Sequence, residues 1–135
     1  MNRSEFCEMM ERAKERSGVK ISEISFKLQM LLPALRRFEK GQHNFNMKKC
    51  IEYLDAIRSQ IVLNGNKKIG SYDELIRYVI EKRTEAYTQM AFAEKIGMSR
   101  LGFANVERNK STMSIDTFLL IADILGITIE IMTYD

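Results

Sequence analysis

The sequence predicts a mainly α-helical protein of two tandem helix-turn-helix units, which form a pseudo-dimer joined by a small antiparallel pair of β-strands. Three observations support this fold class. Apolar residues recur at helical spacing through most of the chain. The order of helices and tight turn in residues 1–66 is repeated in residues 67–135. Each half ends in a short apolar run that is typical of a strand.

Four helices and one strand are expected in the first half. Phe6, Met10 and Ala13 form an apolar stripe on the first helix. Pro33 is tolerated in the first turn of the third helix, because that position needs no intrahelical N–H donor. Asn46 can cap the fourth helix. The helices are expected at residues 4–16, 22–28, 32–38 and 47–57, and the strand at 60–63 before a turn at 64–66.

The second half follows the same order. Ser71 and Glu74 have the spacing of a capping box at the start of its first helix. Gly97 can supply the positive φ that a tight turn between two helices requires. The expected helices are 72–82, 89–96, 100–108 and 115–125, with N-caps Ser71, Thr88, Ser99 and Ser114, and the closing strand is 128–133.

The case for a repeat rests on this shared order and spacing. Placing residue n over residue n + 68 from Ser4 to Leu63 gives sixty pairs, of which six are identical. That identity is barely above chance, so the spacing of the elements carries the inference. The sequence therefore predicts a degenerate unit at residues 1–66 and a second unit at residues 67–135.

Charge is distributed unevenly between the halves. Residues 1–68 carry 14 Lys and Arg against 8 Asp and Glu, so 14 − 8 = +6, whereas residues 69–135 give 7 − 10 = −3. The basic half suggests an anionic partner. Cys7 and Cys50 form no CxxC motif and fall on apolar helix faces, so we interpret them as plain buried thiols.

Several classes of function are excluded by what the sequence lacks. One histidine, no Gly-rich phosphate loop and no convergent pair of carboxylates argue against an enzyme, and neither a cofactor nor a metal is expected. Residues 1–10 have no apolar signal segment. The longest apolar stretch, 118–131, is broken by Asp123 and Glu130, so no membrane span is expected. These features predict a cytoplasmic protein.

Residues 88–109 contain a spaced pattern that resembles a known family. The pattern consists of Thr88-Gln89, Phe92-Ala93, Gly97-Met98-Ser99 and Val106-Glu107-Arg108-Asn109. It is similar to the helix-turn-helix of phage repressors and Cro proteins, the XRE family. With its flanking helices the resemblance covers about residues 72–127. It implies a lambda-repressor-like fold and double-stranded DNA as the partner.

The resemblance implies a role for each matching position. Gln89 would anchor a phosphate from the start of its helix, and Thr88 and Ser99 would lie at the helix starts that face DNA. The base-facing positions would be Arg100, Leu101 and Asn105, and the backbone contacts Arg108 and Lys110. Arg suits guanine and Asn suits adenine, and each such pair discriminates by ~1–3 kcal/mol. The alternative is that Arg100 and Asn105 are merely solvated positions.

Phage repressors also set a basic residue of the first helix against the glutamate that ends the recognition helix. The resemblance therefore implies two ion pairs, Lys14–Glu39 and Lys82–Glu107. We interpret them as part of the architecture as much as of the function.

The first half departs from the family pattern. Gln29 replaces the turn glycine, Leu31 the capping serine and Lys20-Ile21 the Thr-Gln pair. Leu32 and Pro33 occupy base-facing positions and offer no hydrogen bonds. Two interpretations stay open: phosphate contact by Lys20, Arg36, Arg37 and Lys40 with little base readout, or a Leu31-Leu32 patch that binds protein. His43 is interpreted as a solvated loop residue or a phosphate contact.

The two strands are expected to pair with each other. A lone strand leaves its backbone groups unpaired, so residues 60–63 should lie antiparallel to residues 128–132, with residues 64–71 as the hinge between halves. Antitoxins that neutralise kinase-type toxins, which are similar, pair such strands between two chains. The internal pairing makes a monomeric pseudo-dimer with recognition helices about 34 Å apart, and pairing between chains makes a homodimer.

The sequence thus predicts a sequence-specific DNA-binding transcriptional regulator, a repressor that places residues 100–108 in the major groove. Its site should be an imperfect palindrome, recognised more strongly by the second half. Two alternatives remain: an antitoxin-type DNA-binding protein that also masks a toxin, and a protein-interaction module that has lost DNA binding.

Overall fold

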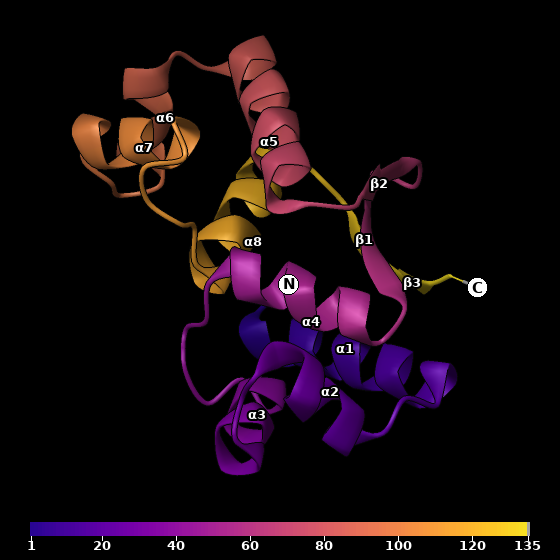
Figure 1. Ribbon diagram of the computed structural model, residues 1–135. Coiled ribbons are helices and arrows are strands. Elements are labelled where there is room, and N and C mark those ends of the chain that lie inside the picture. Colours follow the sequence, from indigo (N-terminus) through magenta and orange to yellow (C-terminus); the bar gives the residue numbers. More distant parts are fainter. Residues whose placement is uncertain (135) are drawn as a thin grey trace.

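The computed structural model describes residues 1–134 of the chain, and this part contains eight helices and three strands (Figure 1). The expectation of a mainly α-helical protein is confirmed. The helices are α1 (Arg3–Ser17), α2 (Ile21–Leu28), α3 (Leu32–Glu39), α4 (Met47–Ala56), α5 (Tyr72–Ala86), α6 (Gln89–Lys95), α7 (Arg100–Glu107) and α8 (Ile115–Leu125). The strands are β1 (Ser59–Leu63), β2 (Lys67–Ile69) and β3 (Ile129–Thr133).

The helices begin where polar caps were expected. The hydroxyls of Ser71, Thr88, Ser99 and Ser114 and the amide oxygen of Asn46 each accept a backbone N–H from the first turn of the helix that follows. Each cap satisfies a donor that has no partner within the helix. The apolar stripe of α1 is also confirmed, because Phe6, Met10 and Ala13 are all buried.

The spacing between the two halves changes by one residue along the chain. Helices α1 and α5 each have 15 residues and start 69 positions apart, whereas α3 and α7 start 68 positions apart. The cause lies in the connections. Gly18, Val19 and Lys20 separate α1 from α2, but only Tyr87 and Thr88 separate α5 from α6. A single offset of 68 therefore misaligns the first helices.

Strand β1 pairs antiparallel with β3, as expected, and Ile61 lies opposite Ile131. The turn expected at residues 64–66 is confirmed, but the segment expected as the hinge, residues 64–71, also contains a strand, β2. Positive φ angles of 51° at Asn64 and 76° at Gly65 turn the chain back, and β2 then pairs with the other edge of β1. The sheet therefore has three strands in the order β2-β1-β3. Pairing the second edge of β1 satisfies backbone groups that would otherwise be open.

Helices α4 and α8 begin side by side and join the two halves. The N–H of Met47 donates to the carbonyl of Met113, and the N–H of Ile115 donates to the carbonyl of Phe45, both at 2.8 Å. One continuous core, from Phe6 to Ile131, runs through both halves. Figure 1 shows α4 and α8 near the middle, with α2 and α3 at one end and α6 and α7 at the other.

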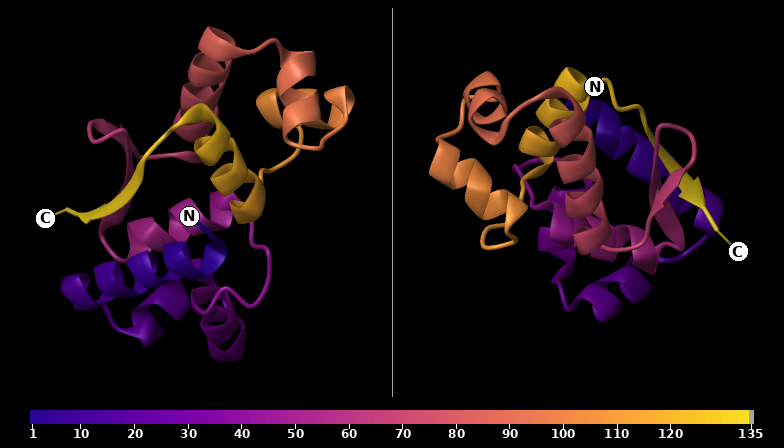
Figure 2. Two further views of the ribbon diagram at one scale, coloured as in Figure 1. Left: turned by 180° about the vertical axis from the view of Figure 1, so that it is seen from behind. Right: turned by 90° about the horizontal axis from the view of Figure 1, so that it is seen from above.

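The two views in Figure 2 place the sheet and the α6–α7 pair on opposite sides of the second half. This arrangement keeps the α6–α7 pair clear of the strands that join the halves. Among residues 1–134, no helix has the length and apolar character needed to cross a membrane.

Candidate nucleic-acid interface

Helices α6 and α7 are joined by a tight turn. The turn depends on Gly97, whose φ is 73°, and on an N–H from Met98 that donates to the carbonyl of Ala93 at 2.9 Å. Phe92 of α6 and Phe103 of α7 are fully buried, and their ring centroids lie 5.4 Å apart. These rings fix the angle between the helices, so the start of α7 is held in a defined position.

The expected base-facing residues lie on the outer side of α7. Arg100 and Leu101 are exposed, and Asn105 is half-buried. Within residues 1–134, no hydrogen bond or ion pair engages the side chains of Arg100 and Asn105. Arg108 and Lys110, just beyond α7, are exposed as well. The structure therefore brings a row of polar and cationic side chains to one accessible helix.

Thr88 and Ser99 hold the starts of α6 and α7. The Thr88 hydroxyl accepts the N–H of Ala91 at 3.2 Å, and the Ser99 hydroxyl accepts the N–H of Gly102 at 3.0 Å. A Cβ at position 102 would lie 2.9 Å from the Ser99 Oγ. Gly102 thus leaves room for the cap, a requirement that sequence reasoning missed.

Glu107, the last residue of α7, is bound by two side chains. The Arg83 guanidinium donates Nε to Oε2 at 2.9 Å and one terminal nitrogen to Oε1 at 2.7 Å. The Gln89 amide donates to Oε1 at 2.8 Å. The bidentate Arg–carboxylate geometry is the strong form of this interaction, and it ties α5, α6 and α7 together.

The expected Lys82–Glu107 ion pair is wrong. Lys82 instead lies 3.7 Å from Glu85 on the same helix, and the next residue, Arg83, reaches Glu107. The connection between α5 and α6 is one residue shorter than the connection between α1 and α2, and this difference turns position 82 away from α7. The side-chain amide of Gln89, expected at a phosphate, is directed onto Glu107.

The equivalent ion pair of the first half is confirmed. Lys14 Nζ lies 2.8 Å from Glu39 Oε2, and the Tyr53 hydroxyl donates to the same oxygen at 2.6 Å. Burial and the bond to Glu39 raise the pKa of Tyr53 far above its usual range.

Cys7 and Cys50 are free, buried thiols, as expected, and burial raises the pKa of each.

Helices α2 and α3 form the corresponding pair in the first half, with different chemistry. Gln29 adopts a φ of 52° at the position of Gly97. Leu31 and Lys20 sit at the N-caps of α3 and α2 without a side-chain bond to the helix. The cations expected to contact phosphate are all exposed: Lys20, Arg36, Arg37 and Lys40.

An apolar surface accompanies those cations. Leu31 is 80% exposed, Leu32 is 37% exposed, and Phe26 of α2 is 84% exposed. Phe26 and Leu31 line one shallow hollow across the turn. The sequence had pointed to Leu31 and Leu32, but Phe26 was missed. Its signal was an aromatic residue two positions from Ile24, off the buried stripe of α2.

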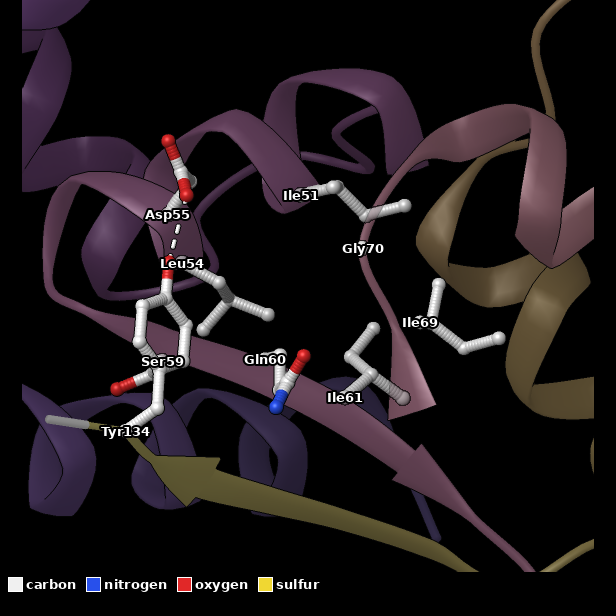
Figure 3. A pocket seen from close by; sticks show the side chains of 9 residues that line it. All are labelled: Ile51, Leu54, Asp55, Ser59, Gln60, Ile61, Ile69, Gly70 and Tyr134. Carbon is white, nitrogen blue, oxygen red and sulfur yellow. Dashed lines mark hydrogen bonds between the residues drawn. The ribbon is translucent and has the colours of Figure 1, made fainter. Parts of the chain in front are cut away.

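A separate cavity of about 260 Å³ lies on the sheet side of the first half (Figure 3). The Tyr134 hydroxyl closes one end by donating to Asp55 Oδ1 at 2.6 Å, and this bond raises the pKa of Tyr134 to about 12. Ile51, Leu54 and Ile61 line much of the remainder. The cavity is remote from α6 and α7, and none of the expected contact residues lines it. Among residues 1–134, no group of three His, Cys, Asp or Glu side chains comes together as metal ligands do.

Comparisons with known proteins found no match to this chain among protein-family models, curated proteins or solved structures.

Proposed function

We propose that the chain is a sequence-specific DNA-binding transcriptional regulator that acts as a repressor and places α7 in the major groove. The observation that carries this proposal is the start of α7. Arg100 there is exposed, Asn105 lies further along the same helix and is half-buried, and neither side chain has a partner among residues 1–134. A recognition helix needs such residues, because base edges are recognised by hydrogen bonds from its outer face.

The charge around α7 fits this assignment. Arg108 and Lys110 follow the end of the helix and are exposed, so they are available for phosphate contacts. The Arg83–Glu107–Gln89 network neutralises the one acidic residue of α7. The helix therefore approaches DNA without a repulsive carboxylate.

Contacts between equivalent residues support a pseudo-dimer. Phe45 and Met113 are 68 positions apart, as are Met47 and Ile115, and the two segments exchange N–H to carbonyl bonds with each other. Ile61 lies opposite Ile131 and Leu63 lies opposite Ile129, and these two pairs interchange under the same offset of 68, because Ile129 corresponds to Ile61 and Ile131 to Leu63. In a two-fold interface, residue i contacts j and j contacts i. We infer a local two-fold axis between the halves, with α3 and α7 as equivalent elements.

A two-fold axis makes one chain suited to two half-sites of a palindrome, about 34 Å apart. The halves carry different residues at the equivalent positions. Ser99 and Arg100, the N-cap and first residue of α7, correspond to Leu31 and Leu32, the N-cap and first residue of α3, 68 residues earlier. The preferred site is therefore an imperfect palindrome, and the stronger hydrogen-bonded readout belongs to the second half.

The test is a selection of randomised DNA duplexes by the purified protein, followed by titrations at two salt concentrations. We expect an enriched motif whose affinity falls steeply with salt. Arg100→Ala and Asn105→Ala should each weaken binding to it by ~1–3 kcal/mol and relax preference at one position. Arg77→Ala is the matched control, because Arg77 is exposed on α5 beside β2, away from α7.

The competing function is a protein-interaction module, and exposure of Phe26 and Leu31 favours it. An antitoxin that binds DNA and masks a toxin combines both functions. The same selection separates them. Failure to enrich any duplex, with weak binding that ignores salt, would exclude the regulator and leave the interaction module.

A further inference from the structure

We propose that the first unit recognises DNA by apolar contact, with Leu31, Leu32 and Pro33 at the start of α3 seated against the C5-methyl groups of thymines. This inference rests on the proposed function and deepens it, because it assigns a base class to the half that offers no polar readout. The unit would thus discriminate between bases as well as bind phosphates.

The first observation is that these residues start α3 at the positions equivalent to the start of α7. Helices α3 and α7 each have eight residues, and they start 68 positions apart. Leu31, Leu32 and Pro33 therefore stand where Ser99, Arg100 and Leu101 stand in the second unit. All three are exposed. If α7 enters a major groove, its counterpart presents these apolar side chains to the base edges of the other half-site.

The positive charge of the same segment indicates what kind of partner it binds. Five exposed cations lie between residues 20 and 40: Lys20, Lys27, Arg36, Arg37 and Lys40. None of the five forms an ion pair within the described residues. Of the two acidic residues in this segment, Glu39 is held by Lys14. Lys27 lines the same hollow as Phe26 and Leu31. An apolar surface on such a cationic segment suits a partner that is strongly anionic and displays methyl groups, which describes the major groove at A·T pairs.

Thymine is the one base of unmodified DNA that shows a methyl group in the major groove. Aliphatic side chains cannot bond to the donors and acceptors of the other bases, but they can bury that methyl. Removal of one buried methyl should weaken binding about fourfold. The expected preference of the first half-site is therefore for thymine.

The experiment replaces thymine by deoxyuridine in the selected duplex, one half-site at a time. Deoxyuridine keeps every hydrogen-bonding group and lacks the methyl. The half-site whose preference is lost with Arg100→Ala belongs to the second unit, so the other belongs to the first. We expect uracil in the first half-site to weaken binding about fourfold for each contacted thymine.

Protein variants then locate the contact. In Leu31→Ala/Leu32→Ala the penalty for uracil in the first half-site should fall, because two of the three proposed contacts are gone while the fold is retained. Leu120→Ala is the control, since Leu120 is 42% exposed on α8 and distant from α3. It should keep the full penalty.

Two results would overturn the inference, and they differ from each other. Equal binding of thymine and uracil in the first half-site, with Arg100-dependent specificity intact, would reject apolar readout and leave the proposed function standing. Absence of any enriched duplex would reject both proposals together.

Discussion

At the scale of single residues, two turns of the same shape are built from different amino acids. Gly97 has a φ of 73° with no atom within 4 Å of where a Cβ would lie. Gln29 has a φ of 52° in the other unit. For a residue with a side chain this conformation costs roughly 1–2 kcal/mol, and glycine adopts it freely at a smaller entropic cost. The first turn therefore stores strain that the second turn does not.

We expect Gln29→Gly to raise the free energy of unfolding by about 0.5–1 kcal/mol, and Gly97→Gln to lower it by a similar amount. Urea denaturation of both variants measures the difference, with circular dichroism to check that the fold is kept. If the two substitutions changed stability in the same direction, backbone strain at Gln29 would not be the cause.

The Arg83–Glu107 pair gives a second prediction at this scale. Its side chains are only 11% and 8% exposed, so removal of the arginine leaves a carboxylate nearly without water. Arg83→Gln should destabilise the protein by about 3 kcal/mol. Lys82→Gln is the matched control, and it should change stability by less than about 1 kcal/mol because the Lys82 and Glu85 side chains are 31% and 60% exposed and their pair is screened by water. Equal losses in both variants would contradict the assignment.

At the scale of elements, most helices could be predicted because their signals are local. Caps such as Asn46, Thr88, Ser99 and Ser114 mark helix starts, and apolar periodicity marks the buried face. Strand β2 could not be predicted in this way. Lys67 and Lys68 carry no strand pattern, and the segment pairs because the open edge of β1 lies beside it. The sequence pattern alone also could not show whether Lys82 or Arg83 reaches Glu107. The answer depends on the connection between α5 and α6, which is one residue shorter than the connection between α1 and α2.

Helices α1 and α8 are linked across the halves by Arg3 and Asp116. The Arg3 guanidinium donates to the Asp116 carboxylate, at 3.0 Å from Nε, and this hydrogen bond holds the pKa of Asp116 below its usual value. Because the folded-state pKa is lowered, the stabilisation is present above the pKa of an unfolded aspartate and is lost as pH falls through the folded value. An NMR titration should show Asp116 titrating low, and Arg3→Ala should return it to the ordinary range. An unchanged titration in that variant would contradict the link.

At the scale of the whole molecule, the proposed pseudo-dimer would place two proposed DNA-contacting units in one chain. The chemical difference between the two units could be predicted from the sequence, because the residues at the proposed contact positions follow directly from where each helix begins. The contribution of Phe26 could not, since its exposure depends on how α2 packs. The reciprocal contacts between Phe45–Met47 and Met113–Ile115 likewise depend on how the halves meet.

One chain should suffice for one operator. We expect sedimentation equilibrium to give a monomer of 15.7 kDa and a complex of one protein with one duplex. The closing strands already pair within the chain, so they leave no need for a second copy. A complex of two proteins with one duplex would favour a homodimer with four units.

The measurement that tests the central claim most directly is a hydroxyl-radical footprint of the protein on its selected duplex, repeated with Arg100→Ala. The account predicts two protected patches on one face of the DNA, about one helical turn apart, with unequal sequence preference and selective weakening of the patch contacted by α7 in the variant. A single patch, or two equal patches that Arg100→Ala leaves unchanged, would contradict it.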